Sequence, residues 1–94
     1  MTVPVLWLPR AAAELDLILD HIERESPQGA LTVALAIRQA ANGLLSQYPK
    51  AGRIGRIVGT RELVIPTTPF IVVYRVRTTR VEILRELHGR RRFP

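Results

Sequence analysis

The residues of this chain best suited to chemistry gather near its C-terminus, where His88 lies among several arginines. Nearby positive charge favours the uncharged imidazole, which can act as a general base when a ribose 2′-hydroxyl attacks its phosphate. Guanidinium groups can stabilise the charge that develops on that phosphate. His88 is therefore a catalytic candidate for RNA cleavage. The candidates for binding an anionic target are Arg85, Arg90, Arg91 and Arg92.

A structural role for His88 is the stronger expectation, because no clear general acid accompanies it. A histidine at the end of a strand commonly serves as a hydrogen-bonding partner. Tyr74 lies inside an apolar run and is expected to be a core ring. Arg61 is expected to pair with Glu62 or Glu82, or to join a binding surface. Phosphate-binding glycine motifs, nucleophile triads and metal-ligand spacings are absent, so neither cofactor nor metal is expected.

Composition and charge restrict the class of protein further. The chain of 94 residues has a formal net charge of +6, and this charge is unevenly spread. Residues 1–49 hold three basic and five acidic side chains, whereas residues 50–94 hold eleven basic and three acidic ones. Such a basic half attracts a polyanion or an acidic protein. With no cysteine and no apolar run of the roughly 18 residues that a membrane span needs, we expect a cytoplasmic protein.

The N-terminal half predicts one strand and two helices. Residues 2–8 alternate β-branched and aromatic side chains, and Pro4 favours an edge position in the sheet. Apolar residues at helical spacing predict helices over 9–25 and 27–48. Ser26 and the proline after it supply an N-cap and a first-turn residue, so the helices should form an antiparallel hairpin.

The C-terminal half predicts three strands after a basic loop. The loop spans 49–59, contains three glycines and is expected to hold a brief strand at 57–58. Residues 61–65, 70–77 and 80–88 are rich in β-branched and aromatic side chains, and the short turns between them suit antiparallel hairpins. The predicted fold class is therefore α+β, with an N-terminal strand, a helical hairpin and a three-stranded antiparallel meander.

These elements are expected to form a single domain over residues 1–94. A hairpin of two helices can cover only one face of the sheet. On the middle strand of the meander, Ile71 and Val73 point to the second face and are followed there by Arg75 and Arg77. We therefore expect an apolar patch that needs a partner. The alternative is that the sheet twists enough for the helical hairpin and the C-terminal tail to cover this face.

Simple alternation assigns the side chains of the last strand to two faces. Val81, Ile83 and Leu87 are expected to share one face with Arg85, whereas Leu84 is expected on the other.

The order of elements and several phrases of the sequence resemble the ParE branch of the RelE/ParE toxin superfamily. The match covers essentially the whole chain, and its strength lies in the ordered set of phrases. These are residues 15–22, Pro49-Lys50-Ala51-Gly52-Arg53, Gly59-Thr60-Arg61-Glu62-Leu63, the run 68–76, Val81-Glu82-Ile83-Leu84 and Leu87-His88-Gly89-Arg90-Arg91.

The resemblance implies a toxin of a type II toxin-antitoxin system that arrests growth when free and is silenced by its cognate antitoxin. Most ParE relatives poison DNA gyrase, whereas RelE relatives cut messenger RNA on the ribosome. The position of a catalytic sheet arginine in the RelE branch falls on Ile71, and the C-terminus has no tyrosine. These departures favour gyrase inhibition over the endoribonuclease. A third alternative is a decayed toxin that only binds its antitoxin.

The antitoxin is expected to contribute an acidic amphipathic segment to a hetero-oligomeric complex. Its apolar anchors would bind the second sheet face, and its carboxylates would pair with the adjacent arginines. The predicted antitoxin-binding residues are Ile71, Val73, Arg75, Arg77 and Leu84.

Overall fold

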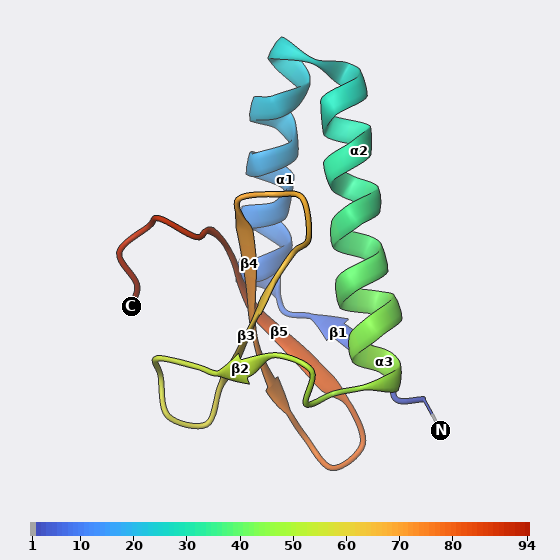
Figure 1. Ribbon diagram of the computed structural model, residues 1–94, viewed down its shortest axis with the longest axis vertical. Helices are drawn as coiled ribbons and strands as arrows, with labels where there is room; N and C mark the ends of the chain where they lie inside the picture. The colour runs from blue at the N-terminus through green and yellow to red at the C-terminus, as the bar shows by residue number, and fades with distance from the viewer. Residues whose placement is uncertain (1) are drawn as a thin grey trace.

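The computed structural model describes residues 2–94, and Met1 of the predicted domain lies outside them. The chain folds as a helical hairpin on one face of a five-stranded sheet (Figure 1). The helical segments are α1 (Pro9–Glu25), α2 (Pro27–Arg38), the π-helical segment η1 (Gln39–Leu44) and α3 (Leu45–Gln47). The strands are β1 (Val5–Trp7), β2 (Arg53–Ile54), β3 (Arg61–Val64), β4 (Phe70–Val76) and β5 (Val81–His88).

The sheet order is β1-β5-β4-β3-β2, and β3, β4 and β5 form the predicted antiparallel meander. This arrangement confirms the α+β fold class. β1 lies at the edge of the sheet, as Pro4 predicted. It pairs with β5 in parallel. The strand is shorter than the predicted range 2–8. Pro4 has no N–H to donate, and its carbonyl oxygen accepts from the Val81 N–H at 2.9 Å just before β1 begins.

The helical hairpin begins and turns where the prolines predict. α1 spans Pro9–Glu25, the predicted range. Ser26 caps α2 by accepting a hydrogen bond from the Gly29 N–H at 2.9 Å, which satisfies a backbone donor that the first turn leaves free. No helix in residues 2–94 is long and apolar enough to cross a membrane.

The second helix widens at η1 before it ends at Gln47, close to the predicted end. A π-helical turn inserts an extra residue into a helix, and no pattern in the sequence predicted it. Within this turn, the Asn42 side-chain oxygen accepts a hydrogen bond from Trp7 Nε1 at 2.9 Å. The wide turn thus ties the helical layer to β1 at the edge of the sheet.

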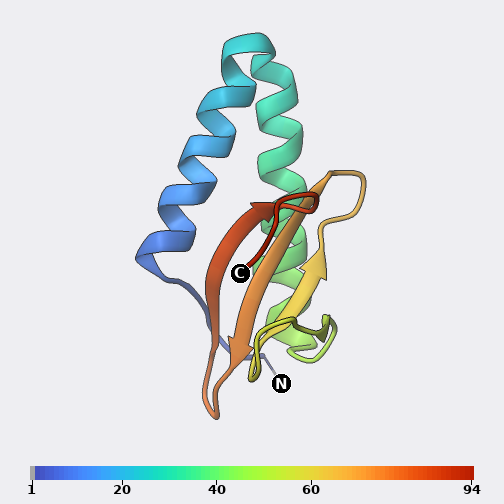
Figure 2. The same ribbon diagram turned by 90° about the vertical axis from the view of Figure 1, so that its left-hand side faces the viewer.

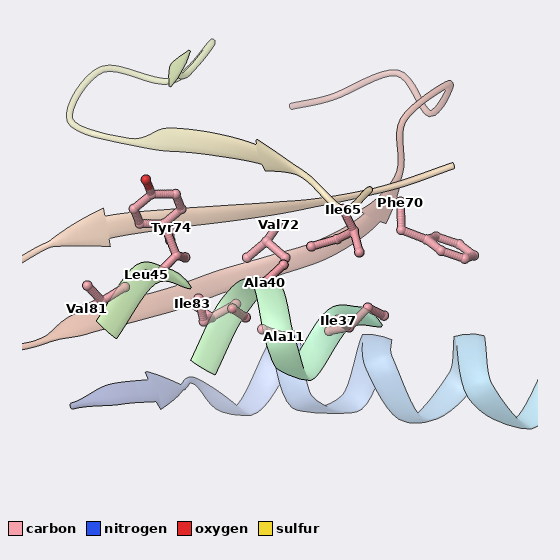
Figure 3. Packing of buried hydrophobic residues seen from close by; sticks show 11 residues of the cluster. Ala11, Ile37, Ala40, Leu45, Ile65, Phe70, Val72, Tyr74, Val81 and Ile83 are labelled. Carbon is pink, nitrogen blue, oxygen red and sulfur yellow. The ribbon is translucent and has the colours of Figure 1, made fainter. Parts of the chain in front are cut away.

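The main hydrophobic core lies between the helices and the sheet. Figure 3 shows side chains from both layers meeting there, among them Ile37 and Leu45 from the helices and Val72, Tyr74 and Ile83 from the sheet. Tyr74 is buried, as predicted, and its hydroxyl accepts a hydrogen bond from the N–H of Gly52 at 2.8 Å. A Cβ on Gly52 would lie 2.8 Å from that hydroxyl, so this position requires glycine.

The prediction of a brief strand at 57–58 is wrong. The short strand is Arg53–Ile54, which pairs with the start of β3. Beyond it the chain closes a tight loop, in which the Gly55 N–H donates to the Thr60 carbonyl oxygen at 2.8 Å. Residues 57–58 lie in the turn of that loop and have no strand partner.

A β-bulge in β5 changes the assignment of side chains to faces. Tyr74 pairs with Ile83, but the preceding residue, Val73, pairs with Arg85. Leu84 is therefore the additional residue of the bulge. Because a bulge places two residues opposite one, strict alternation is broken at this point.

The predicted common face for Val81, Ile83, Arg85 and Leu87 is therefore wrong. Val81 and Ile83 belong to the core beneath the helices. Leu87 packs on the opposite side of the sheet, which we call the outer face. Glu86, which pairs with the core residue Val72, takes a place on the helix side.

Candidate functional site

The outer face is covered by the C-terminal tail, residues 89–94, which folds back across the sheet (Figure 2). Phe93 is buried on this face together with Ile71, Val73 and Leu87. Ile71 is 4% exposed and Val73 is 1% exposed. The expectation of an uncovered apolar patch is therefore wrong, and the alternative of cover by the tail is confirmed, because Phe93 supplies the aromatic ring that removes this patch from water.

Two guanidinium groups flank the ring of Phe93. The Arg56 guanidinium carbon lies 5.7 Å from the ring centroid, and that of Arg85 lies 5.4 Å from it. Both distances suit attraction between a cation and the face of an aromatic ring. We call this arrangement the Phe93 seat. It consists of the apolar floor and the two flanking cations, namely Ile71, Val73, Leu87, Arg56 and Arg85.

Arg85 is held by a carboxylate on the first helix. Its Nε and Nη2 atoms donate to the Glu14 carboxylate at 3.0 and 2.7 Å, and both side chains are at most 15% exposed. Burial alone would raise the pKa of Glu14, but hydrogen bonds from Arg85 and from the Glu86 N–H lower it below its ordinary value. Arg91 adds a contact at 3.8 Å. Arg85, a predicted target-binding residue, is thus committed within the fold.

Glu82 gathers three arginines at one end of the outer face. Arg75, Arg77 and Arg80 all lie within 3.4 Å of its carboxylate. The Arg75 hydrogen bond and then that of Arg80 hold the pKa of Glu82 at about 2. Arg75 and Arg77, predicted to bind the antitoxin, thus share one carboxylate and leave a surplus of positive charge.

Glu62 is a second buried carboxylate on this face. It is 1% exposed and accepts from Arg53 Nη2 at 3.1 Å, from Arg56 Nε at 3.3 Å and from the Arg56 N–H at 2.9 Å. Burial raises the pKa of Glu62, but the backbone bond of Arg56 and the side chain of Arg53 bring it below its ordinary value. These bonds fix Arg56 beside Phe93.

Glu86 has no such partner. It is 1% exposed, and neither carboxylate oxygen has a hydrogen-bond partner in the described residues. Burial, and then the negative charge of Glu14, raises the pKa of Glu86 to about 8, so the group is mostly uncharged at neutral pH. It borders a cavity of about 230 Å³ between α1 and β5, which His88 and Arg91 also line.

The residues considered for acid–base chemistry are engaged in structural contacts. His88 Nδ1 accepts from the Arg90 N–H at 3.1 Å, and its ring meets the Phe70 ring edge-on, with centroids 5.8 Å apart. Arg61 donates to the Gly52 carbonyl oxygen at 2.8 Å. The predicted pairing of Arg61 with Glu62 or Glu82 is wrong, because other arginines occupy both carboxylates, although the structural role is the one expected.

The remaining predicted site residues differ in how accessible they are. Leu84 is half-buried at the bulge. Arg90 and Arg92 are exposed and form no ion pair within residues 2–94, so these two tail arginines can reach another molecule.

Three residues important to this surface were missed from the sequence. Phe93 offered a signal, because it is the one apolar side chain after a run of three arginines. Glu14 lies in the first predicted helix, and only the fold shows that Arg85 reaches it. Glu86 lies on the helix side only because of the bulge.

The sequence of the chain matches the family of the ParE toxin of type II toxin-antitoxin systems, parDE, over residues 5–93. It is 40% identical over 90 residues to the protein Y4kP of Sinorhizobium fredii, which is assigned as a toxin, covering 96% of this chain and 92% of that protein. It is 38% identical over 87 residues to toxin RelE2 of Caulobacter vibrioides, covering 93% of this chain and 96% of that toxin.

The fold is similar to solved toxin-antitoxin structures. For the chromosomal ParDE system from P. aeruginosa the TM-score is 0.82 at 31% identity, covering 93% of this chain and 96% of that one. For the toxin-antitoxin complex RelBE2 from Mycobacterium tuberculosis it is 0.64 at 25% identity, covering 94% and 99%. Since the family match spans nearly the whole chain and the relatives agree with it, the chain belongs to the ParE toxin family of type II toxin-antitoxin systems.

Proposed function

We propose that this toxin stops growth by binding and inhibiting DNA gyrase, and that a cognate antitoxin neutralises it in a hetero-oligomeric complex. The observation that carries the proposal is the structural use of the acid–base candidates. His88 Nδ1 is hydrogen-bonded, the Tyr74 hydroxyl is buried and Arg61 is bound to backbone carbonyls. Inhibition by binding needs no general acid or base, whereas RNA cleavage needs both.

The antitoxin part of the proposal is supported by the charge of the outer face. Three carboxylates, Glu14, Glu62 and Glu82, gather seven arginines, which leaves this face strongly positive. An acidic segment would be attracted over long range and could pair with the exposed cations. The solved relatives, the ParDE system from P. aeruginosa and the RelBE2 complex, include antitoxins. We assign Arg75 and Arg77 to carboxylates of the segment, and Leu84 to its apolar contacts.

Induction of the toxin alone tests the target. We expect plasmid DNA to lose negative supercoiling or to accumulate breaks within one generation, while messenger RNA stays intact. Replacing the exposed Arg90, Arg91 and Arg92 with serine should weaken this effect about tenfold without unfolding the domain, because the run contributes attraction rather than core packing. Early loss of messenger with normal supercoiling would establish the ribonuclease instead. Unchanged growth in the wild type would indicate a decayed toxin.

The His88→Ala variant is expected to keep toxicity within about tenfold of wild type. The side chain accepts one exposed hydrogen bond and makes one ring contact, which together stabilise the strand end by roughly 1–2 kcal/mol. Growth is measured at matched toxin levels, and thermal unfolding verifies the fold. A hundredfold loss of toxicity in a folded variant would place His88 in a catalytic site and contradict the proposal.

A further inference from the structure

We propose that the Phe93 seat is an exchangeable binding site, from which a partner segment with an aromatic side chain flanked by carboxylates displaces Phe93. The inference rests on the proposed function in taking the antitoxin as the protein that carries this segment. It adds that the toxin's own tail competes with that segment for one site. Figure 2 shows the tail lying across the sheet as an irregular segment that is not one of its strands.

The seat is built without the tail. Its floor comes from β4 and β5, whose backbones pair over seven residue pairs. Its two cations are each fixed from elsewhere, Arg85 by Glu14 and Arg56 by Glu62. The seat therefore keeps its shape and charge when Phe93 leaves, as a preorganised binding site must.

The tail is attached weakly by comparison. Phe93 is its one buried residue, and residues 89–92 and Pro94 are exposed. Backbone bonds from Gly89 to Pro69 and from Arg91 to His88 hold only the first part of the tail. The Arg91 side chain adds a contact to Glu14 at 3.8 Å, but it is 57% exposed. An exposed segment with a single buried side chain opens at a small free-energy cost, so the seat is accessible to a competitor.

The seat selects its occupant by chemistry. Loss of Phe93 would expose Ile71, Val73 and Leu87 to water, so a replacement must be apolar. The flanking cations Arg56 and Arg85 favour an aromatic ring. The surplus of arginines around Glu82 and in the tail favours carboxylates beside that ring. An acidic segment with one aromatic anchor meets all three conditions.

The test uses the full chain and two blocked pentapeptides labelled at one end. One has a central phenylalanine with two glutamates on either side, and the other has alanine at the centre. If the tail fills the seat in roughly nine molecules of ten, its removal should increase the affinity about tenfold. We therefore expect Phe93→Ala to bind the aromatic peptide about tenfold more tightly than wild type, measured by fluorescence anisotropy. Leu31→Ala, an apolar truncation on α2, serves as the matched control and should bind like wild type.

A second measurement on the wild type protects the test against a poorly folded variant. Saturation with the aromatic peptide should shift the methyl NMR signals of Ile71 and Leu87 and the ring signals of Phe93, because the Phe93 ring has left the floor. The alanine peptide should do neither. The proposal is overturned if the aromatic peptide binds while Phe93 stays seated, if Phe93→Ala binds no more tightly, or if both peptides bind alike.

Failure of this inference is distinguishable from failure of the proposed function. An antitoxin that binds and neutralises the toxin equally well with and without Phe93 would leave the function standing and refute the exchange. Displacement of Phe93 by the aromatic peptide in a chain that no antitoxin neutralises would support the exchange and refute the function.

Discussion

Replacing Glu86 with glutamine is expected to raise the free energy of unfolding by roughly 3 kcal/mol at pH 7. The carboxyl group is buried, has no hydrogen-bond partner and lies beside the charged Glu14. The folded protein keeps a proton on Glu86 at this pH, whereas the unfolded chain releases it. Folding at pH 7 therefore includes the free-energy cost of binding this proton. Glutamine has nearly the same shape and no proton to lose, so the variant avoids this cost.

The pH dependence has a definite sign. In the folded protein the pKa of Glu86 is about 8, whereas its ordinary value is 4.5. A group with a raised folded pKa contributes fully to stability below pH 4.5, and this contribution is lost as the pH rises through 8. The advantage of Glu86→Gln should therefore be near zero at pH 4, grow through neutral pH and level off above pH 8.

Urea unfolding at pH 4, 7 and 8.5 measures this advantage directly. Glu23→Gln is the matched control, since Glu23 is exposed on α1 and its replacement should have little effect at any pH. An equal gain for both variants, or a gain that does not change with pH, would show that Glu86 is not held uncharged in the fold.

Removal of the Arg85 side chain is the change expected to destabilise the toxin most. Arg85→Met should lower the free energy of unfolding by about 3–5 kcal/mol, because it leaves the mostly buried Glu14 carboxylate without its main partner. The Glu86 N–H, at 3.1 Å, and Arg91, at 3.8 Å, would remain close to it, but neither replaces the paired guanidinium. The variant would also lose the cation–π contact between Arg85 and the Phe93 ring on the outer face.

The double variant Glu14→Gln/Arg85→Met keeps this prediction testable even if the single variant fails to fold. It removes both charges and should recover most of the lost stability. Arg80→Met is the matched control, because Arg80 is 49% exposed and its pairing should contribute at most about 1 kcal/mol. Arg85→Met unfolding at the same urea concentration as Arg80→Met would disprove the importance of the buried pair. A loss of toxicity in an Arg85 variant is therefore attributed to unfolding unless the variant is shown to be folded.

The elements with strong local signals could be predicted from the sequence. Prolines and Ser26 fix the ends of α1 and the start of α2, so the helical hairpin was predicted correctly. Two-residue β2 and the widened turn η1 could not be predicted. β2 pairs with Arg61 and Glu62 of β3 across a tight loop, and η1 contacts Trp7 of β1, which lies far away in the chain. Neither contact has a local signal in the sequence.

The candidate site was predicted less well, because its contacts depend on which face each side chain occupies. Ile71 and Val73 were assigned correctly to the second face, but the residue that covers them comes from the tail. Strict alternation in β5 failed after Ile83, which misplaced Leu87 relative to the core. A tail of arginines suggested only charge, although the Phe93 ring supplies its contact with the sheet.

The bulge at Leu84 also bears on how sequences of this family diverge. Because Tyr74 pairs with Ile83 and Val73 with Arg85, closing the chain at Leu84 would leave a regular strand with every later side chain on its present face. A relative one residue shorter in this strand could therefore keep Arg85 directed at α1. When such a shorter relative is aligned with this chain, the gap belongs at position 84. A gap placed a few residues later would assign the side chains at the end of the strand to the wrong faces. A one-residue deletion at the bulge is thus compatible with both faces of the strand, whereas a deletion near the strand end is not.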